Sequence, residues 1–117
     1  MPYVLLDDGL DGHPKTERAW QDEPVSIGLH ARAMSYCGRY LTDGFVQGAF
    51  VAARLPNARL RSRAVSALEN AGLWERDEAR DGWQIHDYLD YNRSRAQVLA
   101  KRSTDAGRKR ARDGVSV

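Results

Sequence analysis

The sequence predicts a small, mainly α-helical domain that carries one β-hairpin and is followed by a basic helix. Three observations support this prediction: apolar residues recur at helical spacing in several segments before residue 72, two strand-like runs flank an Asp-Gly turn, and the charge changes sign near residue 93. The 117 residues, 42% of them hydrophobic and 29% charged, suit one globular unit. We therefore expect a domain over residues 1–92 and a basic C-terminal helix and tail over residues 93–117.

The first third of the chain predicts one strand and two helices. The run YVLLDDGL is apolar and ends in an Asp-Asp-Gly turn signal, as a short strand would. Pro14 favours a helix start, so a short helix is expected over residues 14–20. A longer amphipathic helix follows Pro24. Its expected buried face consists of Ile27, Ala31, Met34, Gly38 and Leu41.

The centre of the chain predicts two helices joined by a short break. A turn signal and a minimal strand precede the first helix, which is expected over residues 47–54 and ends at Leu55-Pro56. Asn57 is suited to cap the next helix, because its side-chain oxygen can accept a hydrogen bond from a backbone amide two or three residues further on. That second helix is expected over residues 58–71, with a glycine at its end.

This second helix has a polar face that could meet DNA. At about 100° per residue, its large apolar side chains fall on one side, and arginine, serine and asparagine fall on the other. Such side chains bond phosphate oxygens and base edges in a major groove. An ordinary solvated face explains the same pattern, and the helix alone leaves both interpretations open. The candidate DNA contacts here are Asn57, Arg59, Arg61, Ser62, Arg63 and Ser66.

The segment after this helix predicts a hairpin over residues 73–88. The runs LWER and WQIHDY favour strands, and the charged interval between them ends in Asp81-Gly82. Trp74 and Trp83 would pack its base against the helices, while Arg76 and Arg80 near its tip are further candidate DNA contacts. Two helices joined by a break, the second with a basic outer face, followed at once by a hairpin, are the layout of a winged helix-turn-helix.

Several short motifs also carry a family resemblance. HPK, LTDGFV, ALENAGLWE and GWQIHDYLDYN, followed by a basic helix, resemble small helix-turn-helix proteins encoded by phages and prophages of high-GC bacteria. More distantly, they are similar to the N-terminal winged-helix domain of phage replisome organisers. The resemblance covers most of residues 5–102. It implies a winged-helix fold and nucleic-acid binding in transcription control or replication initiation, and it implies no catalytic residue.

The C-terminal segment concentrates positive charge. Residues 93–117 hold eight Lys and Arg against two Asp, a charge of +6, so the rest of the chain carries −4 of the net +2. Ser94 and Gln97 have capping-box spacing, which predicts a helix from about residue 95 past residue 102, and Gly107 favours a mobile arm beyond it. Docking on the domain, pairing with a second subunit and contact with phosphates all remain open. The candidate phosphate contacts are Arg95, Lys101, Arg102, Arg108, Lys109 and Arg110.

The sequence predicts no enzyme, no metal site and no cofactor. Its three histidines lack metal-ligand spacing and are expected to be structural, and there is no Gly-rich phosphate loop. Cys37 lies in a helical pattern, where burial as a small hydrophobic residue is expected. No apolar run is long enough to span a membrane. We expect a cytoplasmic protein, associated with the nucleoid of a bacterial host cell.

Two functions therefore stay open at this stage. The first is a regulator that binds double-stranded DNA, as a monomer or as a homodimer. The second is a module that holds a replication or transcription protein without binding DNA itself, through the acidic first part of the chain. Salt dependence separates the two, because phosphate contacts make DNA binding weaken steeply as salt rises.

Overall fold

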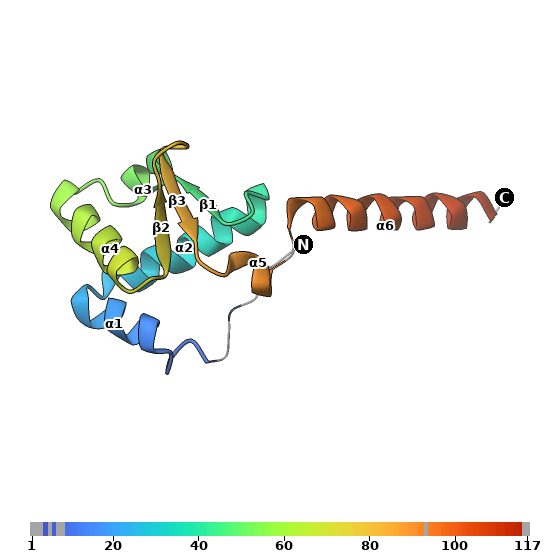
Figure 1. The fold of residues 1–117 in the computed structure, drawn as a ribbon. Coiled ribbons are helices and arrows are strands. Elements are labelled where there is room, and N and C mark those ends of the chain that lie inside the picture. Colours follow the sequence, from blue (N-terminus) through green and yellow to red (C-terminus); the bar gives the residue numbers. More distant parts are fainter. Residues whose placement is uncertain (1–3, 5, 7–8, 93, 116–117) are drawn as a thin grey trace.

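The computed structural model describes residues 4, 6, 9–92 and 94–115 of the chain. It is mainly helical and contains a small three-stranded antiparallel sheet (Figure 1). The molecule is elongated, with principal extents of 62 × 30 × 21 Å. A compact body forms one end, and the C-terminal helix α6 projects from it.

The first two helices are where the sequence predicts them. α1 spans Pro14–Asp22 and is capped by His13, whose Nδ1 accepts a hydrogen bond from the Lys15 amide at 3.1 Å. α2 spans Val25–Tyr40. The sequence also predicts a strand before α1. Four residues of that segment are described, and none of them lies in a strand; the rest of the segment is outside the described residues. Those described are Val4, Leu6, Gly9 and Leu10.

The predicted buried face of α2 is wrong by part of a turn. Ala31 is exposed, whereas the polar residues Ser26 and His30 are buried. Burial of these two is tolerated because each has a hydrogen-bond partner: the Ser26 hydroxyl donates to the Ala19 carbonyl at 3.2 Å, and His30 accepts from the Trp74 indole. Counting apolar residues on a wheel cannot anticipate partners that come from other elements. The buried residues of α2 are Ser26, Leu29, His30, Ala33, Met34 and Cys37.

The central helices confirm the predicted pair. β1 spans Phe45–Gln47, α3 spans Gly48–Arg54 and α4 spans Ala58–Asn70. Asn57 caps α4 as expected, with its Oδ1 accepting from the Leu60 amide at 3.1 Å. Gly72 follows the helix with φ +79°, a conformation that glycine adopts without strain.

The predicted hairpin is part of a larger sheet. β2 spans Trp74–Asp77 and β3 spans Gly82–Ile85, and β1 adds to β3 to give the order β1-β3-β2. A side chain at Gly82 would lie 2.2 Å from the Val46 carbonyl oxygen, so the third strand can pair only because this residue is glycine. The hairpin also ends earlier than residue 88, because the short helix α5 begins at Tyr88 and ends at Tyr91.

One core joins the helices to one face of the sheet. α2 packs against α1, α4 and β1, and α4 packs in addition against α3 and β2. Trp74, at 1% exposure, and Leu68 are among its largest fully buried side chains. Tyr88 from α5 closes the core, and burial raises the pKa of its hydroxyl to about 12.

The basic C-terminal segment forms one long helix. α6 spans Arg95–Val115, and the predicted capping box is present: the Gln97 amide donates to Ser94 Oγ at 3.1 Å, and the Ser94 amide donates to Gln97 Oε1 at 2.8 Å. The expected break at Gly107 is wrong, because the helix continues through it. A glycine lowers helix propensity by only about 1 kcal/mol, and one such residue does not end a helix.

Candidate nucleic-acid interface

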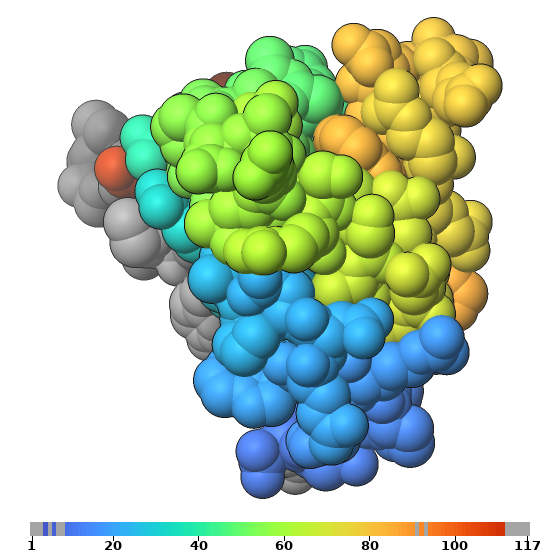
Figure 2. All heavy atoms as spheres, turned by 90° about the vertical axis from the view of Figure 1, so that its left-hand side faces the viewer, coloured from blue at the N-terminus to red at the C-terminus, as the bar shows by residue number. Residues whose placement is uncertain are grey.

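The polar face of α4 lies on the outside of the body. Figure 2 shows α4 in yellow-green at the centre of one face, with α1 in blue beneath it and the hairpin in gold beside it. Two rows of side chains follow this face at a spacing of four residues, one made by Arg59 and Arg63 and the other by Ser62, Ser66 and Asn70. All five side chains are exposed, as the sequence predicts.

Two of the predicted contacts of α4 have side chains that are bonded within the protein. Arg61 is half-buried, and its Nη1 donates to the carbonyl oxygens of Leu55 at 2.9 Å and Pro56 at 3.4 Å. Its guanidinium therefore satisfies the carbonyls of the α3–α4 turn. The Asn57 side chain is engaged as the cap of α4. Both residues position the polar face, and neither presents its bonded atoms to a ligand.

α1 supplies an acidic neighbour to this face. Glu23, directly after α1, forms an ion pair with Arg63, with 3.4 Å between Glu23 Oε1 and Arg63 Nε. The Arg63 side chain is 68% exposed and that of Glu23 is 14% exposed. Arg63 can therefore turn towards a ligand, at the cost of leaving a largely buried carboxylate without this partner.

The hairpin is joined to the helices by a tryptophan at its base. The Trp74 indole N–H donates to His30 Nδ1 at 2.9 Å, inside the core. His30 is buried, and this burial lowers the pKa of its imidazole to about 4. The ring is therefore neutral at neutral pH, with Nδ1 as the acceptor. The prediction that Trp74 packs the hairpin base is confirmed.

Trp83 also packs against the core, as predicted, but is less buried than Trp74. It is half-buried, with its ring centroid 6.0 Å from that of Trp74, and its indole N–H donates to Glu69 Oε1 of α4 at 3.2 Å. The Arg76 guanidinium lies 4.8 Å from the centre of the Trp83 ring on the outer side. Trp83 thus fixes the hairpin to the edge of α4, where the candidate interface lies.

Both arginines of the hairpin are paired with its own carboxylates. Arg76 donates to Asp81 Oδ1 at 3.0 Å and to the Gly82 carbonyl at 3.0 Å. Arg80 donates to Asp77 Oδ2 at 2.7 Å, and this hydrogen bond lowers the pKa of the Asp77 carboxyl.

The hairpin therefore has little positive charge to offer a phosphate. It holds four carboxylates and two arginines, a charge of −2 over residues 74–85. With both arginines paired, a phosphate would have to displace an internal carboxylate to reach either of them.

The basic residues of α6 lie at the other end of the molecule. α4 is at the left in Figure 1, and α6 extends to the right from the opposite side of the body. The structure therefore does not bring the two predicted sets of basic residues together on one face. Arg93 and the side chain of Arg112 lie outside the described residues. The described basic side chains of α6 are all exposed, namely Arg95, Lys101, Arg102, Arg108, Lys109 and Arg110.

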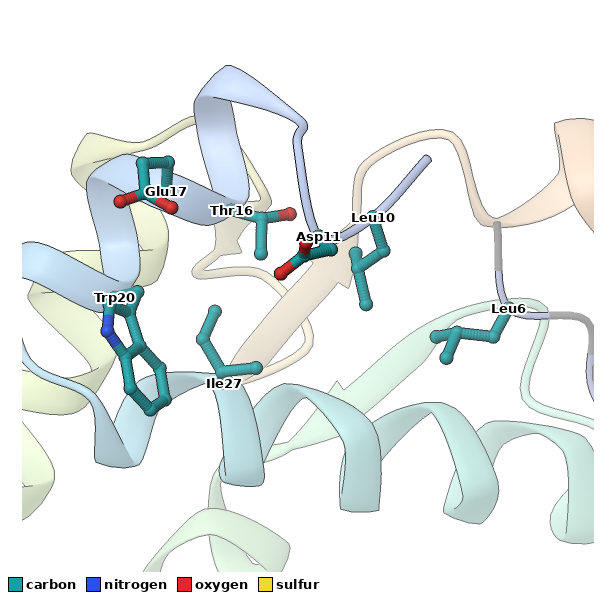
Figure 3. Close-up of a pocket in the computed structure, with 7 residues that line it drawn as sticks. All are labelled: Leu6, Leu10, Asp11, Thr16, Glu17, Trp20 and Ile27. Carbon is teal, nitrogen blue, oxygen red and sulfur yellow. The ribbon is translucent and has the colours of Figure 1, made fainter. Parts of the chain in front are cut away.

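A separate apolar groove lies beside α1. It has a volume of about 510 Å³, and Figure 3 shows Trp20 and Leu6 near its two ends, with Ile27 between them. Trp20 is 52% exposed. The hydroxyl of Thr16, a buried residue that also lines this groove, makes no hydrogen bond to a described residue. The carboxylates of Asp11 and Glu17 add negative charge to its lining.

The remaining groups with reactive chemistry are dispersed. Cys37 is buried, as expected, and burial raises the pKa of its thiol to about 11. His86 lies between Glu75 and Asp87, at 3.2 Å from each carboxylate. Among the described residues, no three of His, Cys, Asp and Glu gather in a way that could hold a metal ion. No helix of the described chain is long and apolar enough to cross a membrane.

Sequence reasoning missed the contacts that set the surroundings of the candidate residues. Glu23 and Glu69, which bind Arg63 and Trp83, come from elements that the sequence does not relate to one another. Asn70 is not among the predicted contacts, although it is exposed and continues the row of Ser62 and Ser66. The four-residue spacing alone could have added it.

Comparison with known proteins gives no relative for this chain: no family model, no curated protein and no solved structure matches it.

Proposed function

We propose that this protein binds double-stranded DNA as a winged helix-turn-helix, with α3 and α4 as the helix-turn-helix and the β2–β3 hairpin as the wing. The observation that carries the proposal is the place of α4. Its polar face is exposed on the outside of the body, and the hairpin flanks it along the edge marked by Trp83. The element order α2, β1, α3, α4, β2, β3 and the strand order β1-β3-β2 fit this arrangement.

The chemistry of the α4 face suits base reading. An arginine can donate two hydrogen bonds to the O6 and N7 atoms of guanine, and serine or asparagine can bond several base edges. Arg63, which projects from the middle of α4 and is 68% exposed, is the strongest candidate for a base contact. Arg59 lies one turn earlier, near the start of α4, and is suited to a base or a phosphate.

In its biological role, the protein would act in transcription control or in replication initiation. This part of the proposal depends on the resemblance to phage and prophage helix-turn-helix proteins. Its structural support is the exposed polar face of α4, whose arginines and serines are suited to duplex DNA.

The test begins by selecting preferred duplexes from a random pool. Affinity for a selected duplex and for a random one is then measured over a salt series. Each phosphate neutralised contributes about −0.9 to the slope of log affinity against log salt, so a steep negative slope is expected. Replacing Arg63 by alanine should lower affinity for the selected duplex by about 1–3 kcal/mol and change random binding much less.

Two control variants sharpen this test. Glu23→Gln removes the carboxylate that pairs with Arg63 and should raise affinity for the selected duplex. Arg32→Ala removes an exposed arginine of α2 and should leave the preference between the two duplexes unchanged. An equal loss on both duplexes in Arg63→Ala would reduce Arg63 to a phosphate contact, and a flat salt dependence would exclude the proposed function.

The groove beside α1 favours a second candidate function, a module that holds another protein. Trp20 is exposed at this groove, and exposed tryptophans are enriched where proteins bind one another. Under this alternative, Trp20→Ala would abolish binding of the partner while the duplex would bind weakly at every salt concentration. Under the first proposal, Trp20→Ala leaves duplex affinity unchanged.

A further inference from the structure

α6 leaves the body at the end opposite to α4. Figure 1 shows α4 and α6 on opposite sides of the body, and the face that carries α4 in Figure 2 shows little of α6. A helix of 21 residues is about 31 Å long, so α6 accounts for about half of the 62 Å length of the molecule. A straight duplex held against α4 therefore has the body between itself and α6.

The start of α6 is bonded to the body. The Arg95 amide donates to Asp43 Oδ1, and the Asp43 carbonyl accepts from Gln84 Nε2 of β3 at 2.8 Å. Asp43 thus connects the first turn of α6 to the sheet. Together with the capping box of Ser94 and Gln97, this connection gives α6 its direction away from α4.

Beyond its base, α6 has no partner within the described chain. From Arg95 to Ala111 its residues are exposed, apart from Val98 and Gly107, which are half-buried, and α6 packs along no other described element. An isolated helix is only marginally stable in water. Such a helix gains stability when a partner binds along it.

Five of the six described basic residues of α6 form two rows. The longer row consists of Arg95, Arg102 and Lys109, at intervals of seven residues. The shorter row consists of Lys101 and Arg108, also seven residues apart. Seven residues make almost two helical turns, so each row stays on one side of a continuous helix, over about 21 Å for the longer row. Asp105, in ion contact with Lys101, is the one acidic side chain described in α6.

This charge pattern selects the chemical class of the partner. Leu99, at 42% exposure, is the one large exposed apolar side chain described in α6, and residues 103–111 hold none, so a protein partner lying along α6 would find few of the apolar anchors on which interfaces depend. A second copy of α6 would be repelled by the same positive charge. Phosphates need only exposed positive charge, which the two rows supply.

We propose that α6 holds the phosphates of a DNA segment other than the one that α4 reads, so that one chain bridges two duplex segments. This proposal rests on the proposed function of α4. It assigns the two ends of the molecule different tasks: α4 selects a sequence, and α6 attaches a second segment regardless of its sequence.

The experiment measures bridging directly. A selected duplex is attached to beads, a fluorescent duplex of unrelated sequence stays in solution, and both the bound protein and the captured fluorescence are recorded. The variant with Arg95→Gln, Arg102→Gln and Lys109→Gln removes the longer row. A matched control, with Arg18→Gln, Arg32→Gln and Arg39→Gln, removes three exposed arginines of α1 and α2 and changes the net charge equally.

The native chain and the matched control should capture the fluorescent duplex, and the α6 variant should capture at least about tenfold less while remaining on the beads. If the native chain binds the beads but captures no fluorescent duplex, bridging is overturned and the proposed function of α4 stands. Capture by the α6 variant equal to the native value would also overturn it. A dimer mass in light scattering at the assay concentration would assign bridging to subunit pairing instead, and absence of the native chain from the beads would overturn both proposals.

Discussion

At the scale of single residues, arginines close together in the sequence have different roles. Arg61 donates to the carbonyls of the α3–α4 turn, whereas Arg59 and Arg63, two positions before and after it, face outward. The difference arises because two residues rotate the direction of a side chain on a helix by about 200°. In the hairpin, Arg76 and Arg80 are exposed yet held by carboxylates. Exposure alone therefore does not identify a side chain that is available to a ligand.

The buried imidazole of His30 should make stability depend on pH. Its pKa is about 4 in the folded protein, against 6.5 for an ordinary histidine, so between these values the unfolded chain binds a proton that the folded chain does not. The free energy of unfolding should therefore fall as pH decreases from 6.5 to 4, by up to about 3 kcal/mol. Above pH 6.5 this group should contribute no pH dependence.

Urea unfolding of the native protein and His30→Gln at neutral and mildly acid pH measures this effect. Glutamine does not titrate and keeps an oxygen that can accept from the Trp74 indole. The variant should lose about 2–3 kcal/mol less than the native protein on acidification to about pH 4.5. The same loss in both proteins would show that His30 does not govern the acid sensitivity.

At the scale of elements, the hairpin and α6 differ in how their charges are compensated. The hairpin pairs its two arginines internally, while α6 exposes five of its six described cations without a carboxylate partner among the described residues. Ion pairs on a surface contribute little to stability, but they do decide which cations are ready to meet a phosphate. α6 is therefore the more available of the two for phosphates, although the hairpin lies beside α4.

Releasing the hairpin arginines should strengthen the DNA binding that we propose. Asp77→Asn removes the carboxylate that holds Arg80 and leaves the weaker bond from its Nη2 to Gln84 Oε1, and each additional phosphate contact should add up to about −0.9 to the salt slope. Glu78→Gln is the matched control, because it removes the same charge from the hairpin without freeing either arginine. An equal gain in both variants would assign the effect to net charge, and no gain in Asp77→Asn would place the hairpin away from DNA.

The continuity of α6 predicts the effect of replacing its central glycine. A side chain at Gly107 would meet nothing within 4 Å, so Gly107→Ala should stabilise the helix by about 0.5–1 kcal/mol and raise helicity in circular dichroism. Duplex capture through α6 should be retained or improved. If Gly107 acts as a hinge, the same variant would bind DNA less well, and Gly107→Pro would be tolerated.

At the scale of the whole molecule, the shape depends on α6 projecting into solvent. The radius of gyration of the Cα atoms is 17.5 Å, whereas a compact chain of 117 residues would have about 13 Å. The difference arises because α6 projects from the body. The body is acidic and α6 is basic, so the two parts carry net charges of opposite sign.

Small-angle X-ray scattering of the free protein should therefore give a radius of gyration near 17.5 Å. Added salt should change it little, because no ion pair joins α6 to the rest of the described chain. A value near 13 Å at low salt that increases with added salt would mean that α6 folds back onto the acidic body, which would remove it from contact with DNA.

The sequence by itself determined the features that depend on near neighbours. The N-cap of Asn57 and the capping box of Ser94 and Gln97 could be predicted, because each bond joins residues three positions apart. The exposure of the α4 polar face followed from helical periodicity.

Only the tertiary structure decided the features that depend on residues far apart in the chain. The burial of His30 rests on Trp74, 44 residues away, and the direction of α6 depends on a bond from Arg95 to Asp43, 52 residues away. The third strand of the sheet and the pairing of Arg63 with Glu23 are of the same kind. Such contacts form only when several elements are packed at once, and so no local pattern records them. For this reason the sequence predicted that α4 and α6 both carry basic residues, but it could not predict that these two helices lie at opposite ends of the molecule.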